Sequence, residues 1–374
     1  MKFIVSSTTL LKHLSTINGV IANNPIVPIL ENFLFQLDQN TLTVTSSDMQ
    51  TVMITELQVE SKDKGAIAVP AKLLLETLRT LPEQPIQVKI DPETFGTEVI
   101  TSNGRFKLAG ENPMDFPRIP TVARNFGIEL ESGTLATAIV NTLFATSTDD
   151  LRPAMTGVFV QLSPEGTTFV ATDGHRLIRY TRKDVKADTA STMILPRKAL
   201  NLLKSSLPSE NTPVKADFSQ SNAFFSFGNI KMICRLIDER FPDYENVIPT
   251  VNPNKLVIER ADLVSSLRRI AIYANKTTHQ IRLKVSAKEL VISAEDLDYS
   301  NEATEKIQCE YDGEEMEIGF NAKFLVEMLN NIQAKTLSIE MSQPNRAGLI
   351  LPTEQDEDEN ILMLVMPVML NTYA

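Results

Sequence analysis

The feature that most constrains the fold is a threefold internal repeat. The segment from Val69 to Pro82, VPAKLLLETLRTLP, recurs as LPRKALNLLKSSLP and again as FNAKFLVEMLNNI. The three copies place Lys72, Lys198 and Lys323 in register, at separations of 126 and 125 residues. A repeat of this length is the size of a whole domain, so the 374-residue chain is predicted to contain three similar domains.

Each repeat also opens with an amphipathic helix pattern, in which apolar residues recur every three or four positions. Together with the helix that carries the aligned lysine, this pattern predicts two helices per repeat. We expect them to start near residues 8, 71, 133, 197, 262 and 322. The predicted buried positions are Leu10, Leu14, Ile17, Leu74, Leu78, Leu81, Leu135, Ile139, Leu143, Leu263, Leu267 and Ile270.

Strand patterns fill the space between the helices. The segments LTVTSSD, TFVATD and LVISAED end at the aligned residues Asp48, Asp173 and Asp296. Asn103-Gly104 and Gly228-Asn229 are typical of tight hairpin turns. The predicted fold class is therefore α+β, with two helices packed on antiparallel sheet in each domain.

Proline-rich linkers separate the repeats, because Phe116-Pro117 precedes Ile119-Pro120 much as Phe241-Pro242 precedes Ile248-Pro249. Such X-Pro steps favour extended connections. We expect domains at residues 1–120, 121–249 and 250–374.

The composition argues against most enzyme and cofactor classes. The chain has 14 glycines, three dispersed histidines and two cysteines, and it lacks the common nucleotide-binding, metalloprotease and hydrolase motifs. We expect no metal and no cofactor. Because no stretch approaches the roughly 20 uncharged apolar residues of a membrane span, and the N-terminus does not resemble a cleavable signal, we expect an intracellular, cytoplasmic protein with no membrane partner.

The net charge of −11 ordinarily opposes nucleic-acid binding. Residues 1–120 hold 10 basic and 13 acidic residues, residues 121–249 hold 14 of each, and residues 250–374 hold 12 and 20. Binding to DNA would require the basic side chains to gather on one surface. The helices carry such candidates at Lys72, Arg79, Arg197, Lys198, Lys204, Arg268, Arg269 and Lys323.

Two further segments suggest local chemistry. In Asp173-Gly174-His175-Arg176, a carboxylate lies beside an imidazole, which leaves open acid–base catalysis, a tight turn or a binding role. The run ILMLVMPVML near the C-terminus predicts a strand that Pro367 ends, followed by apolar residues that either bind a partner or dock on their own domain.

Three motifs together, ATDGHRLIRY (171–180), ERFPDYENVIP (239–249) and LVMPVML (364–370), resemble the bacterial DNA polymerase III beta subunit family, the sliding clamps. The resemblance spans the whole chain. It implies a non-catalytic processivity factor that forms a head-to-tail homodimer, a ring of six similar domains through which duplex DNA is threaded.

The resemblance also implies roles for particular residues. The dimer interface would join the first domain of one chain to the third domain of the other, and Arg152 is the better candidate for a DNA contact in the loop near Asp149. The residues implied at the interface are Leu74, Leu78, Arg105, Phe106, Lys107, Leu108, Ile272, Tyr273, Glu302 and Glu305.

In this family a hydrophobic groove receives short motifs of the replicative polymerase alpha subunit, the clamp loader, other polymerases and repair proteins. The resemblance implies polar rim roles for His175 and Arg176. Asn246 and Met369 stand where relatives often have arginine, and residues 371–374 extend beyond the usual end. The implied groove residues are Met155, Thr172, Gly174, His175, Arg176, Leu177, Pro242, Asn246, Val247, Val365, Met366, Pro367, Val368, Met369 and Leu370.

Two other functions remain open from the residues alone. One is an enzyme, such as a hydrolase, that uses Asp173 and His175. The other is a repeat scaffold that binds proteins and never meets DNA.

Overall fold

The computed structural model describes residues 1–120 and 126–370. The chain folds into two compact units. The first comprises residues 1–136 and 198–236, and the second comprises residues 137–197 and the chain from 237 onward. The middle third of the sequence therefore contributes strands to both units.

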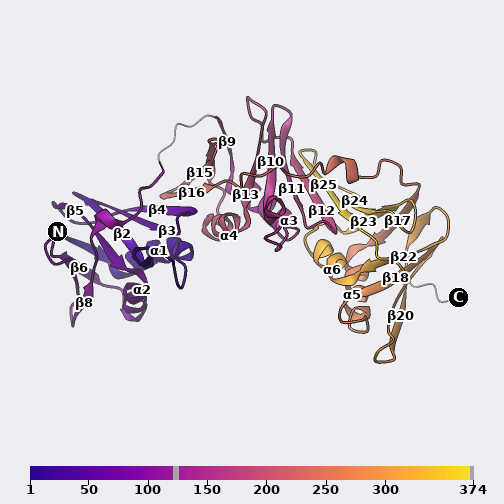
Figure 1. Ribbon diagram of the computed structural model, residues 1–374, viewed down its shortest axis with the longest axis horizontal. Coiled ribbons are helices and arrows are strands. Elements are labelled where there is room, and N and C mark those ends of the chain that lie inside the picture. The colour runs from indigo at the N-terminus through magenta and orange to yellow at the C-terminus, as the bar shows by residue number, and fades with distance from the viewer. Residues whose placement is uncertain (121–125, 371–374) are drawn as a thin grey trace. The chain divides into compact units, whose positions relative to one another are not determined.

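All six predicted helices are present and start within two residues of their predicted positions. Side-chain caps explain two of these starts: Ser6 accepts the N–H of Thr9, and Asn321 accepts those of Lys323 and Phe324. The helices pack in pairs within the units, α1 against α2 and α5 against α6 (Figure 1). Their bounds are α1 (Ser7–Ile17), α2 (Ala71–Thr80), α3 (Ser132–Leu143), α4 (Arg197–Ser206), α5 (Arg260–Ile270) and α6 (Ala322–Asn330).

The predicted apolar helix faces are buried. Leu10, Leu14 and Ile17 of α1 have no exposed surface, and the corresponding residues of α3 and α5 are at most 7% exposed. Leu81 alone is half-buried, because α2 ends at Thr80 just before it. The helical periodicity therefore predicted the core correctly.

The first unit contains two antiparallel sheets among its described residues. In the larger sheet, β4 of the first repeat pairs with β16 of the middle repeat, so one sheet continues across the first repeat boundary. That sheet runs β5 (Lys64–Pro70), β2 (Asn32–Asp38), β3 (Thr41–Ser47), β4 (Thr51–Gln58), β16 (Ile230–Arg235), β15 (Asn222–Phe227), β14 (Pro213–Phe218), β9 (Phe126–Glu131). The smaller sheet runs β1 (Lys2–Ser6), β6 (Pro85–Ile90), β7 (Gly96–Ile100), β8 (Arg105–Ala109).

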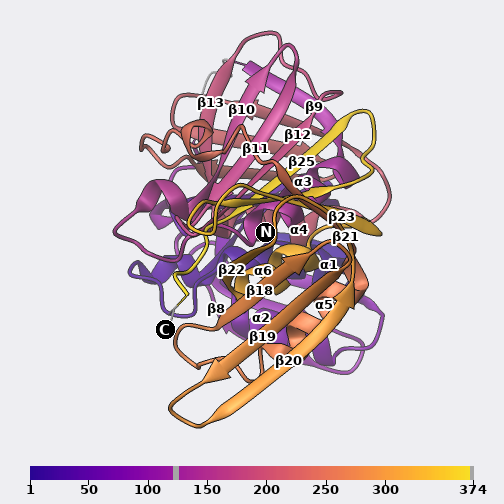
Figure 2. The ribbon, with the colours of Figure 1, turned by 90° about the vertical axis from the view of Figure 1, so that its right-hand side faces the viewer.

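The second unit repeats this plan in its described part. Here β12 pairs with β25, which places Arg176 opposite Val365 and carries a sheet across the second repeat boundary. That sheet runs β13 (Ser191–Pro196), β10 (Gly157–Ser163), β11 (Gly166–Thr172), β12 (Arg176–Arg182), β25 (Glu359–Val365), β24 (Gly348–Pro352), β23 (Thr336–Met341), β17 (Asn254–Glu259), β21 (Glu310–Asp312). The second sheet, seen in Figure 2, runs β20 (Asn301–Gln308), β19 (Glu289–Asp296), β18 (Gln280–Ser286), β22 (Met316–Asn321).

The predicted strand ends and hairpins are confirmed. The strands β3, β11 and β19 end at or one residue before Asp48, Asp173 and Asp296. The turn between β15 and β16 contains Gly228 with a φ of +51°, a conformation that glycine adopts without a steric penalty. The predicted extension at 371–374 lies outside the described residues. Across those that are described, no helix has the length and apolar character needed to traverse a bilayer.

Lys198 joins the first two repeats inside the first unit. Its ammonium group forms an ion pair with Asp48, at the end of β3, and donates a hydrogen bond to the carbonyl oxygen of Val20 at 3.3 Å. Val20 closes the short 3₁₀ turn Asn18–Val20 that follows α1. The carboxylate of Asp48 also accepts the backbone N–H groups of Gln50 and Thr51. The lysine therefore ties helix α4 to a strand end and a helix end of the preceding repeat.

We predict that Lys198→Met lowers the free energy of unfolding by about 1 kcal/mol, because the pair is half-exposed and its hydrogen bonds are few. Urea unfolding of the full chain measures this change. Lys204→Met is the matched control, since Lys204 is exposed on the same helix. Equal stability of the two variants would contradict a structural role for Lys198.

Candidate protein-docking surface

A pinned turn between β11 and β12 forms the centre of the site. Oδ1 of Asp173 accepts the backbone N–H groups of His175 and Arg176 at 2.9 and 3.0 Å. Thr172 Oγ1 accepts the N–H of Gly174, whose φ of +89° favours glycine. The turn therefore holds its shape through its own side chains.

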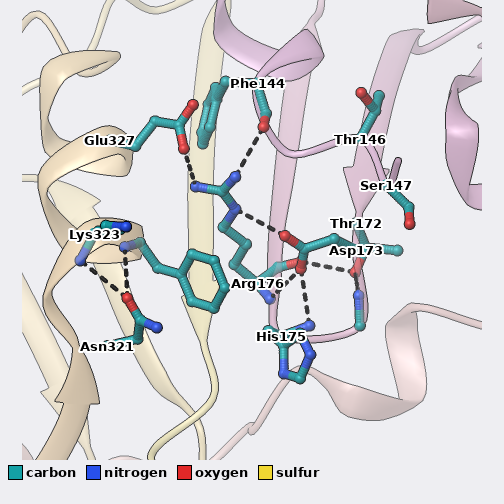
Figure 3. Close-up of polar contacts among 12 residues, drawn as sticks. Phe144, Thr146, Ser147, Thr172, Asp173, His175, Arg176, Asn321, Lys323 and Glu327 are labelled. Carbon is teal, nitrogen blue, oxygen red and sulfur yellow. Dashed lines mark hydrogen bonds and ion pairs between the residues drawn. The ribbon is translucent and has the colours of Figure 1, made fainter. Parts of the chain in front are cut away.

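The Asp173 carboxylate holds the turn in place and does not pair with the His175 imidazole for acid–base chemistry. Its second oxygen, Oδ2, accepts Nε of Arg176 at 3.0 Å. The His175 ring instead stacks on Phe324 of α6, with ring centroids 5.8 Å apart. The proposed catalytic pairing of carboxylate and imidazole is thus absent, because the carboxylate contacts the backbone of His175 and not its ring (Figure 3).

Arg176 is buried and satisfies its charge within the chain, as Figure 3 shows. Besides Asp173, it donates to Glu327 of α6 at 2.7 Å and to the carbonyl of Phe144, just after α3, at 3.0 Å. Its guanidinium carbon lies 5.3 and 4.8 Å from the ring centroids of Phe144 and Phe324. The planar, multidentate guanidinium suits such a site better than an ammonium group would.

This burial corrects the expected rim position of Arg176. Its side chain is 7% exposed, so it cannot act as a polar rim group. Its role is to hold the β11–β12 turn against the end of α3 and against α6. His175 and Gly174 are the exposed members of the turn.

The C-terminal segment leaves the sheet beside this turn. Val365 ends β25 and is fully buried, while the N–H of Met366 donates to the carbonyl of His175 at 2.8 Å. After Pro367, the N–H of Val368 donates to the carbonyl of Gly319 in β22 at 2.9 Å. Pro367 has no N–H for a ladder, which explains why the strand ends there.

The linker after β16 supplies the remaining residues. Phe241 and Tyr244 are buried in a cluster with Leu177 and Leu364 of the central strands. Phe241 stacks on Phe159 with 4.6 Å between ring centroids. The residues around these two anchors point outward, and Val247 is 54% exposed.

The implied groove residues all belong to the second unit, and we name them the candidate docking surface. Thr172, Arg176, Leu177 and Val365 are buried and support it, whereas Met155, Pro367, Val368 and Leu370 are half-buried. The exposed members are Gly174, His175, Pro242, Asn246, Val247, Met366 and Met369.

Sequence reasoning missed Phe144, Phe324 and Glu327. Phe324 and Glu327 lie inside the helix that carries Lys323, where the other repeats have Leu73 and Ala199 in place of the phenylalanine. An aromatic ring at one copy of a repeated position was the available signal. Phe144 follows the predicted helix without any pattern that marks it, although Arg176 contacts both its backbone carbonyl and its ring.

The basic residues implied to face DNA are mostly exposed, and several are paired. Lys72, Arg79, Lys204, Arg268 and Lys323 are exposed, and Arg197 is half-buried. Three of the implied residues pair with acids of the same chain: Lys198 with Asp48, Arg152 of the loop after α3 with Asp149, and Arg269 with Glu305.

Two carboxylates of these ion pairs have lowered pKa values. The bidentate hydrogen bond from Arg269 lowers the pKa of Glu305 to about 2. The pKa of Asp149 is lowered, first by the N–H of Leu151 and then by Arg152. Both carboxylates therefore stay ionised at neutral pH with a partner in the same chain.

The implied dimer residues divide into two groups. Phe106, Ile272 and Tyr273 are 38%, 73% and 43% exposed, and Arg105, Lys107 and Glu302 are also exposed. Leu74, Leu78 and Leu108 are at most 2% exposed, which corrects their expected place on the interface. The helical face of Leu74 and Leu78 packs into its own domain, and Leu73, which is 49% exposed, lies on the outer face.

Across residues 1–120 and 126–370, no group of three His, Cys, Asp or Glu side chains is placed to hold a metal ion. The repeated helix pairs, the sheets that cross repeat boundaries and an apolar surface without a catalytic group define a three-domain clamp-type protein. Comparison with known proteins then identifies the family.

Domain profiles of the DNA polymerase III beta subunit match in chain order: the N-terminal domain at residues 1–120, the central domain at 129–243 and the C-terminal domain at 245–369. The chain is 30% identical to the beta sliding clamp of Escherichia coli K12 and 29% identical to that of Vibrio cholerae, covering 99% of this chain and 100% of each relative. A Pseudomonas aeruginosa sliding clamp crystallised with griselimycin is 27% identical and superposes with a TM-score of 0.94, over 99% of this chain and 100% of that one.

The chain therefore belongs to the DNA polymerase III beta subunit family of bacterial sliding clamps. It is a non-catalytic processivity factor of DNA polymerase III, with three clamp domains. The interpretation of Asp173 and His175 as a hydrolase site was wrong.

We predict that Arg176→Met lowers the free energy of unfolding by about 3 kcal/mol, because it leaves the largely buried Asp173 carboxylate without its cation. Urea unfolding measures the loss. Arg152→Met, at an exposed ion pair, serves as control and should cost less than about 1 kcal/mol. A similar cost for both variants would show that burial of Arg176 is not what matters.

Proposed function

We propose that two copies of the chain close head to tail into a ring that encircles duplex DNA. The helices face the DNA with basic side chains such as Lys72, Arg268 and Lys323, which contact phosphates without reading sequence. Enclosure holds the clamp on DNA, so a chain of net charge −11 needs only weak contacts. Domain boundaries near residues 120 and 249 are part of this proposal.

The observation that carries the ring is that exposed apolar side chains occur in the first repeat and, as a different set, in the third. Phe106 with Leu73 belongs to the first repeat, and Ile272 with Tyr273 belongs to the third. Because the two sets differ, their contact is heterologous and avoids open filaments only if the ring closes. In this contact, the exposed basic residues Arg105 and Lys107 of the first repeat face Glu302 of the third, a local complementarity between two repeats that are both net negative, at −3 and −8. Arg105 also pairs with Glu98 of its own chain.

The candidate docking surface, in this proposal, receives short linear motifs. Its buried supports keep the turn rigid, and the exposed side chains of Val247, Met366 and Met369 offer adaptable apolar contacts. The partners are the replicative polymerase alpha subunit, the clamp loader, other polymerases and repair proteins. The protein acts in the cytoplasm, on the cell's own DNA.

We predict that Val247→Asp combined with Met366→Asp weakens motif binding at least tenfold, because both exposed side chains then present charge to an apolar ligand. The measurement is fluorescence polarisation with peptides tiled over the polymerase alpha subunit of the same bacterium. Val251→Asp is the control, since Val251 is 74% exposed but outside the docking surface. Unchanged binding by the double variant would place the motif site elsewhere.

We predict that the loaded clamp remains on nicked circular DNA and leaves when the circle is linearised. Ile272→Asp should abolish retention and give the mass of a single chain in light scattering, because it places a charge in the dimer contact. Leu151→Asp, at a residue 91% exposed, should keep the mass of two chains. Equal retention on circular and linear DNA would exclude threading.

A further inference from the structure

The linker edge of the docking surface is acidic. Phe241 and Tyr244 are buried in the core cluster, and the exposed residues around them include Asp243 and Glu245. The linker segment 238–247 contains four acidic residues and a single basic residue, Arg240. This edge therefore presents a net negative charge next to apolar Val247.

The nearby cations Arg179 and Arg240 offset only part of this charge, since the linker segment alone holds four acidic residues. Asn246 is neutral, and its amide donates to Oδ2 of Asp243 at 2.7 Å, which orients that carboxylate at the surface. The C-terminal segment 365–370 has no charged residue.

The basic residues near the β11–β12 turn are already paired with carboxylates. The guanidinium of Arg176 is shared between Asp173 and Glu327, so this cation with its two carboxylates carries a net negative charge, and the Glu327 side chain is 50% exposed. Arg152 is the cation beside Gly174, and it is paired with Asp149 at 2.9 Å.

Tyr244 lies next to the same carboxylates. Its hydroxyl is 3.4 Å from Oε1 of Glu245. Burial is the main cause that raises the pKa of this hydroxyl to about 12, and Glu245 and Asp243 add to the rise, whereas Arg179 opposes it.

We propose that the docking surface selects a segment in which a lysine or arginine lies beside the apolar anchor, with the basic side chain against Asp243 and Glu245. This preference deepens the proposed docking function and rests on it. The apolar residues supply the anchor, and the acidic edge favours one sign of flanking charge.

Both carboxylates are exposed, which limits the difference in affinity that they can produce between peptides. Rim charges at an interface change affinity modestly, mainly through the association rate, and salt screens them. Two such charges should favour a basic over an acidic peptide by about 2- to 30-fold at low salt, the range expected for two exposed ion pairs.

The test uses the full-length protein and two labelled ten-residue peptides that share a Leu-Phe anchor and differ only in a preceding Lys-Lys or Glu-Glu pair. Dissociation constants are measured by fluorescence polarisation at 50 mM and 500 mM salt. The variant is Asp243→Asn with Glu245→Gln. The control is Glu314→Gln with Glu315→Gln, which removes the same charge from exposed positions outside the docking surface.

The expected result is tighter binding of the Lys-Lys peptide at 50 mM salt, a loss of the difference in the linker variant and at 500 mM salt, and its retention in the control variant. Equal binding of both peptides, or tighter binding of the Glu-Glu peptide, would overturn the charge preference and leave docking intact. Failure of both peptides to bind would count against the docking surface itself. If the difference between the peptides also disappears in the control variant, it comes from the net charge of the whole protein and not from the linker edge, and the proposal is overturned.

Discussion

The joining of the repeats depends on one antiparallel sheet that crosses each junction, through the pairing of β4 with β16 and of β12 with β25. Beside each of these pairings, a cation is held between a strand-end aspartate and the carbonyl that follows a helix. At the first junction, Lys198 binds Asp48 and the carbonyl of Val20. At the second junction, Arg176 binds Asp173 and the carbonyl of Phe144. Both aspartates end aligned strands, and both carbonyls follow the first helix of their repeat.

The two junctions differ in which element supplies the cation, and this difference has consequences for the surface. Lys198 reaches its partners from helix α4 of the next repeat, and its side chain is 51% exposed. Arg176 belongs to the turn itself and is 7% exposed, so the helix of the next repeat contributes Glu327 and the Phe324 ring instead. Only the second arrangement places a turn pinned by a buried guanidinium beneath exposed apolar side chains. This explains in physical terms why the second junction suits a docking segment.

The distribution of charged residues limits how this chain can hold DNA. Several basic residues that could contact DNA are already paired with acids, as Arg269 is with Glu305 and Arg152 with Asp149. The unevenly distributed acids, 20 of them in the last third against 12 basic residues, would repel DNA if affinity alone held the complex. A closed ring removes that requirement, which is why the architecture and the composition are compatible under the proposed function.

Periodicity in the sequence determined the repeat number, the helices with their buried faces, the strand ends and the family, because these depend on local spacing and on motif order. Tertiary structure decided the rest. Arg176 is buried and supports the β11–β12 turn, and Leu74, Leu78 and Leu108 lie in the core. Burial depends on which elements pack together and not on residue type. The pairing of β4 with β16 and of β12 with β25 likewise joins segments about 180 residues apart in the chain. No local pattern encodes such a contact, because its free energy comes from surfaces that meet only after folding.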